Sequence, residues 1–331
     1  MKDPCTNPQK LGSAPNRLRR LLAEDGITVA PGVFNPIAAQ LAQNAGFKAL
    51  YFSGGAFANS MGLPDLGVFT LSELVRAVHQ ITDLVEAPLI VDIDTGFGET
   101  ANVKRAVAEM ERGGVAAVHL EDQVMPKRCG HLSGKQVIGV EEMMRKLVAA
   151  KGAGKGSLVL IARTDARSVL GLQAAIERAQ AYLEAGADMI FPEALETPEE
   201  FAEFARKVDA PLMANMTEFG KTPYMDVAEF RKLGYKIVIF PQTAFRVMLK
   251  AVKDAYEELM ASGTQKWLLE RMMTRDEIYD LIDYYSYESM DKTIARTVAD
   301  IMARMVLELE QISGEKSRND LCIKNGNTIH S

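Results

Sequence analysis

Residues 119–135, HLEDQVMPKRCGHLSGK, place a cysteine in a polar, basic stretch of the chain. This residue, Cys129, is one of three cysteines and is surrounded by Lys127, Arg128 and His131. A cysteine kept for packing is expected in an apolar run, because a free thiol behaves as a small buried hydrophobe. A cysteine kept for chemistry is expected near positive charge, which stabilises the thiolate and lowers its pKa. The stretch therefore predicts a reactive cysteine, and the alternative is an incidental cysteine in a solvated basic loop.

Four carboxylates are spaced so that they can meet at one metal ion. In VDIDTGFGE, Asp92 and Asp94 stand two residues apart, so a strand directs both side chains to the same side. Glu121 ends the next apolar run, and Asp65 lies in the earlier loop GLPDLG. Neighbouring carboxylates repel each other and persist most readily beside a cation. Oxygen ligands without histidine or cysteine suit Mg²⁺, for which Mn²⁺ can substitute. The alternative is a solvated acidic rim with helix-capping roles.

Short apolar runs alternate with helix-like segments through most of the chain. The runs cover residues 27–33, 49–54, 88–94, 116–122, 157–165, 188–194, 211–216 and 236–241. They are rich in branched apolar residues and bounded by Gly, Pro or Asp, as buried parallel strands are. Helices are expected after Thr70, up to Gly113 and up to Gly186. The pattern predicts an α/β fold, a (β/α)₈ TIM-type barrel, which typically has about 250 residues. A doubly wound open sheet is the alternative, but no GxGxxG fingerprint follows the first run.

Polar residues stand repeatedly where the expected strands end. TIM-type barrels place their catalytic groups on the loops after these carboxyl ends. The residues are Ser53 with Gly54 and Gly55, Asp92 and Asp94, Glu121, Arg163, Glu193, and Asn215 with Thr217. Any one of them alone is explained as a helix cap, but six consecutive strands that end in this way predict one shared mouth.

The opening stretch lies on an expected lid. Residues 123–136 show little apolar periodicity, and loops beyond about 12–15 residues in compact domains are often lids or binding loops. Gly130 and Gly134 provide backbone freedom. The basic residues, His131 among them, provide positive charge for a bound anion and for a thiolate. The alternative for His131 is a surface position, and His119 is expected to be packed within its strand.

Composition limits the partners and the location. The chain has 331 residues, a net charge of −6 and a pI near 5.5, which argues against a nucleic acid as partner. No CxxC spacing indicates a zinc site or a disulfide framework. Neither a signal-peptide core nor a run of about 20 apolar residues is present, so we expect no membrane and a cytoplasmic location. The expected organisation is an N-terminal segment at 1–26, the barrel at 27–260, a helical extension at 261–313 and a disordered tail at 314–331.

A series of ordered motifs over roughly residues 15–300 resembles the isocitrate lyase and phosphoenolpyruvate mutase superfamily. The motifs are SGG, GLPDLG, VDIDTGFG, KRCGH, ARTDA, FPEA, NMTEFG and AFR. The resemblance implies a TIM-type barrel and a Mg²⁺-dependent carbon–carbon lyase that cleaves (2S,3R)-2-methylisocitrate to pyruvate and succinate, in the methylcitrate cycle of propionate catabolism. Isocitrate, 2,3-dimethylmalate and oxaloacetate are the alternative substrates. Phosphoenolpyruvate mutases match less well, because they generally lack the cysteine of KxCGH.

The resemblance also implies metal ligands. Asp92 and Asp94 would hold the ion, and Asp65 and Glu121 would contribute through the surrounding shell.

For the reaction itself, the resemblance makes Cys129 the catalytic acid/base. Tyr51 would handle the substrate hydroxyl proton, and Glu193 would orient the site. The substrate would meet Ser53, Gly54, Gly55, Gly130, Arg163, Asn215, Thr217, Arg246 and Arg275.

The methyl group of the substrate needs an apolar pocket, for which Phe191 and Ile239 at two strand ends are the candidates. Ordinary core packing is the alternative for both residues. A barrel that binds carboxylates without turnover is the non-enzymatic alternative for the whole chain.

The C-terminal part is helix-like and apolar enough to need a partner surface. Residues 267–309 contain a cluster of tyrosines at 279, 284, 285 and 287. These helices either pack on their own barrel or exchange between subunits, and the resemblance implies a homotetramer with swapped helices.

Overall fold

The computed structural model describes residues 12–325, with side chains up to residue 310. The chain divides into two compact units, one ending at Gly263 and the other beginning at Thr264. Among the described residues, no helix is both long and apolar enough to cross a bilayer.

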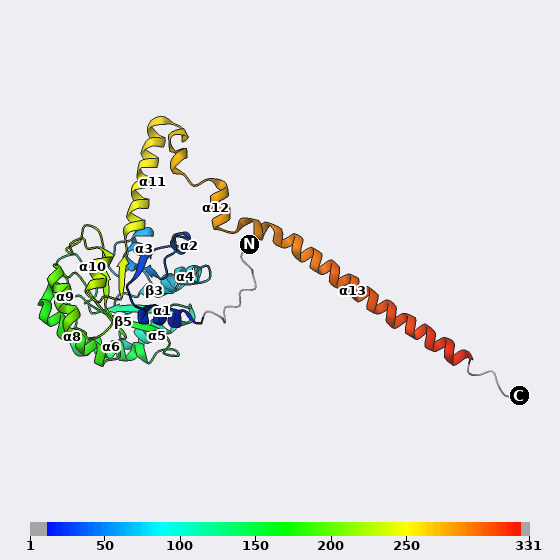
Figure 1. Cartoon of the computed structure of the whole chain (residues 1–331), viewed down its shortest axis with the longest axis horizontal. Helices are drawn as coiled ribbons and strands as arrows, with labels where there is room; N and C mark the ends of the chain where they lie inside the picture. The colour runs from blue at the N-terminus through cyan, green and yellow to red at the C-terminus, as the bar shows by residue number, and fades with distance from the viewer. Residues whose placement is uncertain (1–11, 326–331) are drawn as a thin grey trace. The chain divides into compact units, whose positions relative to one another are not determined.

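Eight parallel strands form the centre of the first unit (Figure 1). They are β1 (Thr28–Val33), β2 (Leu50–Phe52), β3 (Leu89–Asp92), β4 (Ala117–Glu121), β5 (Val159–Thr164), β6 (Met189–Pro192), β7 (Met213–Asn215) and β8 (Ile237–Phe240). Their order is β6-β5-β4-β3-β2-β1-β8-β7. The two end strands meet where the Ile190 amide donates to the Pro211 carbonyl at 3.1 Å, beside a parallel bridge between Ile190 and Leu212. The ring is therefore a barrel, and the open doubly wound sheet is excluded.

One helix of this unit precedes the first strand, and the others follow the strands around the outside of the barrel. They are α1 (Ala14–Ala23), α2 (Pro36–Asn44), α3 (Gly54–Ser60), α4 (Leu71–Thr82), α5 (Thr100–Arg112), α6 (Val140–Lys151), α7 (Arg167–Leu170), α8 (Leu172–Glu184), α9 (Pro198–Lys207), α10 (Val227–Lys232) and α11 (Thr243–Ser262). Side chains at the helix starts define several of these boundaries. Thr70 and Asp226 form capping boxes for α4 and α10, and Thr197 caps α9 just before Pro198.

Side chains alternate between two hydrophobic layers, because successive residues of a strand point to opposite faces of the sheet. On β2, Tyr51 points into the barrel and Phe52 points outward against the helices. Leu18 of α1 joins the inner layer, and Arg19 Nη1 donates to the Ser157 carbonyl at 2.7 Å, just before β5. Helix α1 therefore closes the barrel at the amino ends of the strands and leaves the carboxyl ends free for a site.

The second unit is helical. It contains η2 (Lys266–Arg271), α12 (Arg275–Leu281) and the long α13 (Tyr284–Asn325), the last drawn in orange and red in Figure 1. The rings of Tyr279 and Tyr284 stack with their centroids 4.2 Å apart, so part of the tyrosine cluster packs within this unit.

The C-terminal tail differs from expectation over part of its length. Residues 314–325, expected to be disordered, continue α13, and no proline interrupts the chain after Pro241. Residues 326–331 of that tail, and residues 1–11 of the N-terminal segment, lie outside the described residues.

Candidate active site at the carboxyl ends of the strands

A cavity of about 50 Å³ lies at the carboxyl ends of the barrel strands, beneath the lid loop. Most of the predicted site residues line it: Tyr51, Ser53, Gly55, Asp65, Asp92, Cys129, Gly130, His131, Arg163, Phe191, Glu193, Asn215 and Thr217. Lys127, Arg128, Pro241 and Gln242 complete the wall. The sequence did not single out Gln242 or Pro241, although both follow β8 directly and obey the same strand-end rule as the others.

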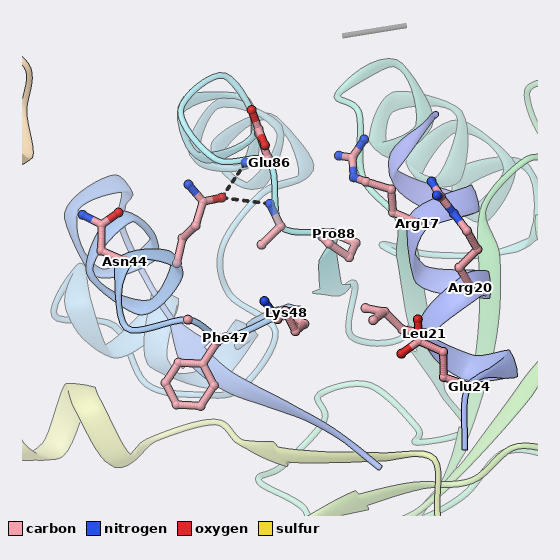
Figure 2. A pocket seen from close by; sticks show the side chains of 12 residues that line it. Arg17, Arg20, Leu21, Glu24, Asn44, Phe47, Lys48, Glu86 and Pro88 are labelled. Atoms are coloured by element: carbon pink, nitrogen blue, oxygen red, sulfur yellow. Dashed lines mark hydrogen bonds between the residues drawn. The ribbon is translucent and has the colours of Figure 1, made fainter. Parts of the chain in front are cut away.

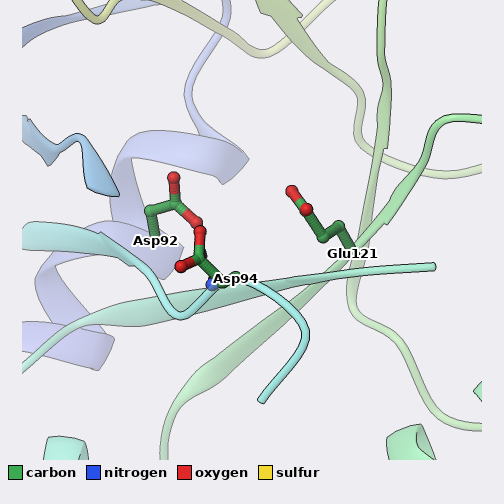
Figure 3. A group of neighbouring side chains, drawn as sticks. All are labelled: Asp92, Asp94 and Glu121. Atoms are coloured by element: carbon green, nitrogen blue, oxygen red, sulfur yellow. Dashed lines mark hydrogen bonds between the residues drawn. The ribbon is translucent and has the colours of Figure 1, made fainter. Parts of the chain in front are cut away.

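Three carboxylates meet beside this cavity (Figure 3). Asp92, Asp94 and Glu121 are buried, and one oxygen of each lies within 4.8 Å of the others. The Asp92 carboxylate accepts hydrogen bonds from the amides of Gly54 at 3.1 Å and Asp94 at 3.0 Å. Asp94 takes a positive φ of 47°, a conformation that costs about 1–3 kcal/mol and is found at functional sites. The backbone thus holds the Asp92 carboxylate in place next to the other two.

The oxygens of Glu121 fit a metal ion. Within the described part of the chain, neither oxygen accepts a hydrogen bond, although Arg163 Nη1 lies 3.3 Å from Oε2. Burial raises the pKa of Glu121 well above its usual value despite Arg163. Burial and the charge of Asp92 raise the pKa of Asp94 to about 7, against the opposing effect of Lys127. Buried carboxylates with spare lone pairs are suited to a hard divalent cation.

Lys127 compensates part of this negative charge. Its buried ammonium group contacts Asp65 Oδ1 and lies 2.8 Å from Asp94 Oδ1. The loop lysine therefore serves the carboxylates, whereas the sequence predicted that it would stabilise a thiolate. Asp65 pairs with Lys127 and does not belong to the trio of Asp92, Asp94 and Glu121.

Cys129 is half-buried and is not a low-pKa thiol. Burial raises its pKa, and the charges of Asp65 and Glu193 raise it further, while a hydrogen bond from the backbone of His131 and the charge of Arg163 oppose this shift. The predicted lowering of the thiol pKa is therefore wrong, because burial of the thiol outweighs the nearby positive charge and Lys127 pairs with Asp65 and Asp94 instead of the thiol. A thiol in this environment keeps its proton at neutral pH.

Glu193 is the centre of a second polar group. It accepts from His131 Nε2 at 2.8 Å and Asn215 Nδ2 at 3.2 Å, and Arg163 Nη1 lies 3.6 Å away. Burial would raise its pKa, but Arg163 and His131 hold it well below the usual range. The Lys221 amide donates to His131 Nδ1 at 3.0 Å, which leaves the ring proton on Nε2 facing Glu193. His131 is therefore part of the site and is not at the surface.

His119 is packed, as predicted, and it also contacts two site residues. Its ring stacks on Tyr51 at 5.6 Å, and Tyr51 Oη lies 2.6 Å from His119 Nε2. Asp92 Oδ1 is 3.4 Å from the same nitrogen. Burial lowers the pKa of His119 to about 4, so the imidazole is neutral. Burial and the charge of Asp92 raise the pKa of Tyr51 well above 10.

Besides Asp94 and Glu121, four predicted residues do not line the cavity. Gly54 contacts the Asp92 carboxylate through its amide, and Ile239 is buried in the inner layer of the barrel. Arg246 lies 3.3 Å from Glu218 Oε2 and over the ring of Phe219. Arg275 is exposed and begins α12 of the second unit.

A short ladder anchors the lid to the barrel. Gln123 and Val137 form an antiparallel bridge, and the Val124 amide donates to the Gln136 carbonyl at 2.9 Å. At the tip, Gly130 lies directly against the site. A methyl group at that position would stand 2.4 Å from Glu193 Cγ and 2.6 Å from Arg163 Nη2. Glycine is thus required for the lid to come this close.

A larger cavity of about 650 Å³ lies elsewhere, at the amino ends of β2 and β3 (Figure 2). Arg17, Arg20 and Lys48 line it together with Glu24 and Glu86. It contains none of the predicted site residues, and its charges are mixed in sign. Size alone therefore does not mark the chemical site.

Comparisons with known proteins agree with the geometry. The phosphoenolpyruvate phosphomutase family matches residues 18–260. A 2-methylisocitrate lyase of Aeropyrum pernix is 56% identical over 87% of this chain and 93% of its own length. One of Bacillus subtilis is 49% identical over 85% of this chain and 93% of its own length.

Solved structures show the same architecture. A 2,3-dimethylmalate lyase has a TM-score of 0.80 at 34% identity and covers 86% of this chain and 96% of its own. A phosphonopyruvate hydrolase in complex with oxalate and Mg²⁺ has a TM-score of 0.77 at 30% identity and covers 85% of this chain and 99% of its own.

The fit of Gly130 predicts that Gly130→Ala displaces the lid. The added methyl group would overlap Glu193 and Arg163, so iodoacetamide should label Cys129 at least several-fold faster than in the wild type, as measured by mass spectrometry of the Cys129 peptide. Gly139→Ala is the matched control, because no atom of the other described residues lies within 4 Å of its added methyl group. An equal labelling rate in Gly130→Ala and Gly139→Ala would contradict the closed packing.

Proposed function

This chain belongs to the phosphoenolpyruvate mutase and isocitrate lyase superfamily, and we propose that it is a carbon–carbon lyase that cleaves (2S,3R)-2-methylisocitrate to pyruvate and succinate. The observation on which the proposal depends is a half-buried thiol, Cys129, on a lid above a buried carboxylate trio and an arginine. The curated relatives of this name at 49–56% identity support the choice of substrate. In that role the enzyme would serve the methylcitrate cycle of propionate catabolism.

We propose that Asp92, Asp94 and Glu121 hold a divalent cation, Mg²⁺ or in its place Mn²⁺. The free lone pairs of Glu121 support this assignment, and so does the Mg²⁺ in the related phosphonopyruvate hydrolase. Such a cation, when bound, supplies Lewis acidity that lowers the pKa of a coordinated hydroxyl group. Asp65 would contribute indirectly, through Lys127.

The substrate carboxylates need donors, and the cavity offers several. Arg163 presents a guanidinium group, Asn215 and Thr217 add side-chain donors, and the turn at Ser53 and Gly55 adds backbone amides. Arg246 and Arg275 remain candidates for the remaining carboxylate, each as a proposal that rests on the family resemblance.

The cleavage reaction requires Cys129 to carry a proton when the carbon–carbon bond breaks. The substrate hydroxyl group loses its proton, the C2–C3 bond breaks, and its electron pair remains on C3 as a carbanion next to a carboxylate. The Cys129 S–H then protonates C3 to give succinate, and the thiolate regains a proton before the next turnover. A thiol with a raised pKa suits this direction, because the proton must still be present when the carbanion forms.

Tyr51 is the proposed partner of the hydroxyl proton. The phenolate form of Tyr51 is disfavoured, so Tyr51 would act as a proton relay. It would accept the hydroxyl proton while the phenol proton moves toward Nε2 of the neutral His119, which lies 2.6 Å from Tyr51 Oη. Glu193 would keep Arg163, His131 and Asn215 in place, and it touches the lid at Gly130.

Discrimination between substrates is proposed to depend on Phe191. This ring lines the cavity, with the Arg163 guanidinium 5.2 Å from its centroid, whereas Ile239 is buried in the same inner layer of the barrel and does not line the cavity. One methyl group in a hydrophobic pocket is worth about 1–3 kcal/mol, which gives discrimination of roughly 10- to 200-fold. Isocitrate, 2,3-dimethylmalate and oxaloacetate are the competing substrates.

Cleavage of 2-methylisocitrate should be metal-dependent. With Mg²⁺ we expect pyruvate from 2-methylisocitrate at roughly 10-fold or more the rate of glyoxylate from isocitrate, and no product of either after chelation. The two products are quantified separately. A comparable rate of glyoxylate formation would indicate isocitrate as the substrate. No product from any of the four substrates would indicate a barrel that binds carboxylates without turnover.

Removal of the acid should separate turnover from binding. Cys129→Ser is expected to lower kcat by about 10²- to 10⁴-fold while pyruvate and succinate bind within a few-fold of the wild type, because only proton delivery is lost. Cys5→Ser is the control and should retain full activity. Undiminished turnover by Cys129→Ser would eliminate the proposed acid.

We further propose a homotetramer in which helices of the second unit exchange between subunits. Exposed apolar side chains form a stripe along α13 at Met290, Ile294, Val298, Ile301 and Met305, a spacing that matches one face of a helix against another copy. A second copy of this chain is the proposed occupant of the stripe.

Sedimentation equilibrium tests this assembly. The wild type should have a mass near four times 36.3 kDa, and Val298→Glu should lower that mass. Lys292→Glu lies on the opposite face of α13 and should leave the mass unchanged. A wild-type monomer would refute the tetramer.

A further inference from the structure

One buried lysine joins the end of the lid to its tip. Lys135 follows the second lid glycine, and only 1% of its side chain is exposed. Its ammonium group donates to the Gly130 carbonyl, next to Cys129, and lies 2.6 Å from Asp165 Oδ1. A buried ammonium group needs such partners, because desolvation without them is costly.

Asp165 also orients the site arginine. Its Oδ2 accepts from Arg163 Nε at 2.9 Å and its Oδ1 from Arg163 Nη2 at 3.1 Å, a two-bond arrangement that fixes the plane of the guanidinium group. The Asp165 amide donates to Asp122 Oδ1 at 2.8 Å, so the carboxylate is anchored through the backbone. Lys135 therefore shares one carboxylate with Arg163.

Gly130 and Arg163, which are linked through Lys135 and Asp165, also contact each other directly at the lid tip. An added methyl group at Gly130 would stand 2.6 Å from Arg163 Nη2, so the lid backbone lies directly on the guanidinium group. A closed path thus runs from Gly130 through Lys135 and Asp165 to Arg163. Movement of the lid away from the barrel would break the contact of Lys135 with one partner or the other.

We infer that Lys135 is a positioning residue that sets the closed position of Cys129 relative to Arg163. The acid function of Cys129 rests on the proposed lyase activity, whereas the lid position does not. Without the ammonium group, Asp165 keeps both bonds to Arg163, but the Gly130 carbonyl loses its donor and the lid tip is released. A displacement of about 1 Å in the acid can cost roughly 100-fold in rate.

The experiment compares Lys135→Met with Lys151→Met. Lys151 forms an ion pair of the same 2.6 Å length with Asp188, but this pair is partly exposed and lies away from the cavity, so it controls for the loss of a lysine contact. Iodoacetamide labelling of Cys129 without substrate reports the lid position. Steady-state kinetics with 2-methylisocitrate report its consequence, and thermal unfolding confirms folding.

We expect Lys135→Met to label at least several-fold faster, with kcat lowered about 10- to 100-fold and KM changed less than threefold. Lys151→Met should match the wild type. If Lys135→Met does not fold, Lys135→Gln, which fills the site without the charge, is expected to change both readouts in the same direction.

A folded Lys135 variant with the wild-type labelling rate would overturn the inference, as would a loss of activity confined to KM. Failure of the wild type to cleave 2-methylisocitrate would overturn the proposed function alone, because the labelling comparison still decides the role of Lys135.

Discussion

The site at the carboxyl ends of the barrel strands buries more negative charge than a protein interior normally tolerates. The rest of the site depends on how that charge is compensated. Asp92, Asp94, Glu121, Asp165 and Glu193 are all at most 5% exposed. Buried carboxylates persist when cations and hydrogen bonds compensate them. Here an arginine of a strand and lysines of the lid compensate them. The lid therefore neutralises charge in the site and also covers it. Lys127 and Lys135 of the lid neutralise carboxylates of the barrel in the same conformation in which the lid covers the cavity.

The fold could be predicted from the sequence because its signals are local. Each of the eight apolar runs is a strand, and the capped helix that starts after Thr70 lies where its sequence places it. The rule that functional groups follow strand ends located most of the cavity wall, from Ser53 to Thr217. The strand and helix patterns and the polar strand ends are each properties of a few neighbouring residues. The barrel then brings all the strand ends together at one site.

The partners of the charged groups could not be predicted, because they depend on contacts between distant parts of the chain. The sequence pattern places Lys127 beside the thiol, but its ammonium group contacts Asp65, 62 positions away in the sequence. Asp122 is only the last residue of an apolar run in the sequence, yet it accepts from Thr164, Arg178 and Tyr182 and anchors the loop after β5. The raised pKa of Cys129 follows first from burial of the thiol and then from nearby carboxylates, and neither can be read from the sequence around the cysteine.

The raised pKa of Cys129 also affects how the protein withstands oxidants. Peroxide attacks thiolates, and susceptibility to sulfenic acid formation follows thiolate character and exposure. Cys129 is half-buried and keeps its proton at neutral pH, so it is a poor target on both counts. Many catalytic cysteines need a reductant to remain active, because the charge that activates them also exposes them to oxidation. This one is protected by the same burial that preserves its proton.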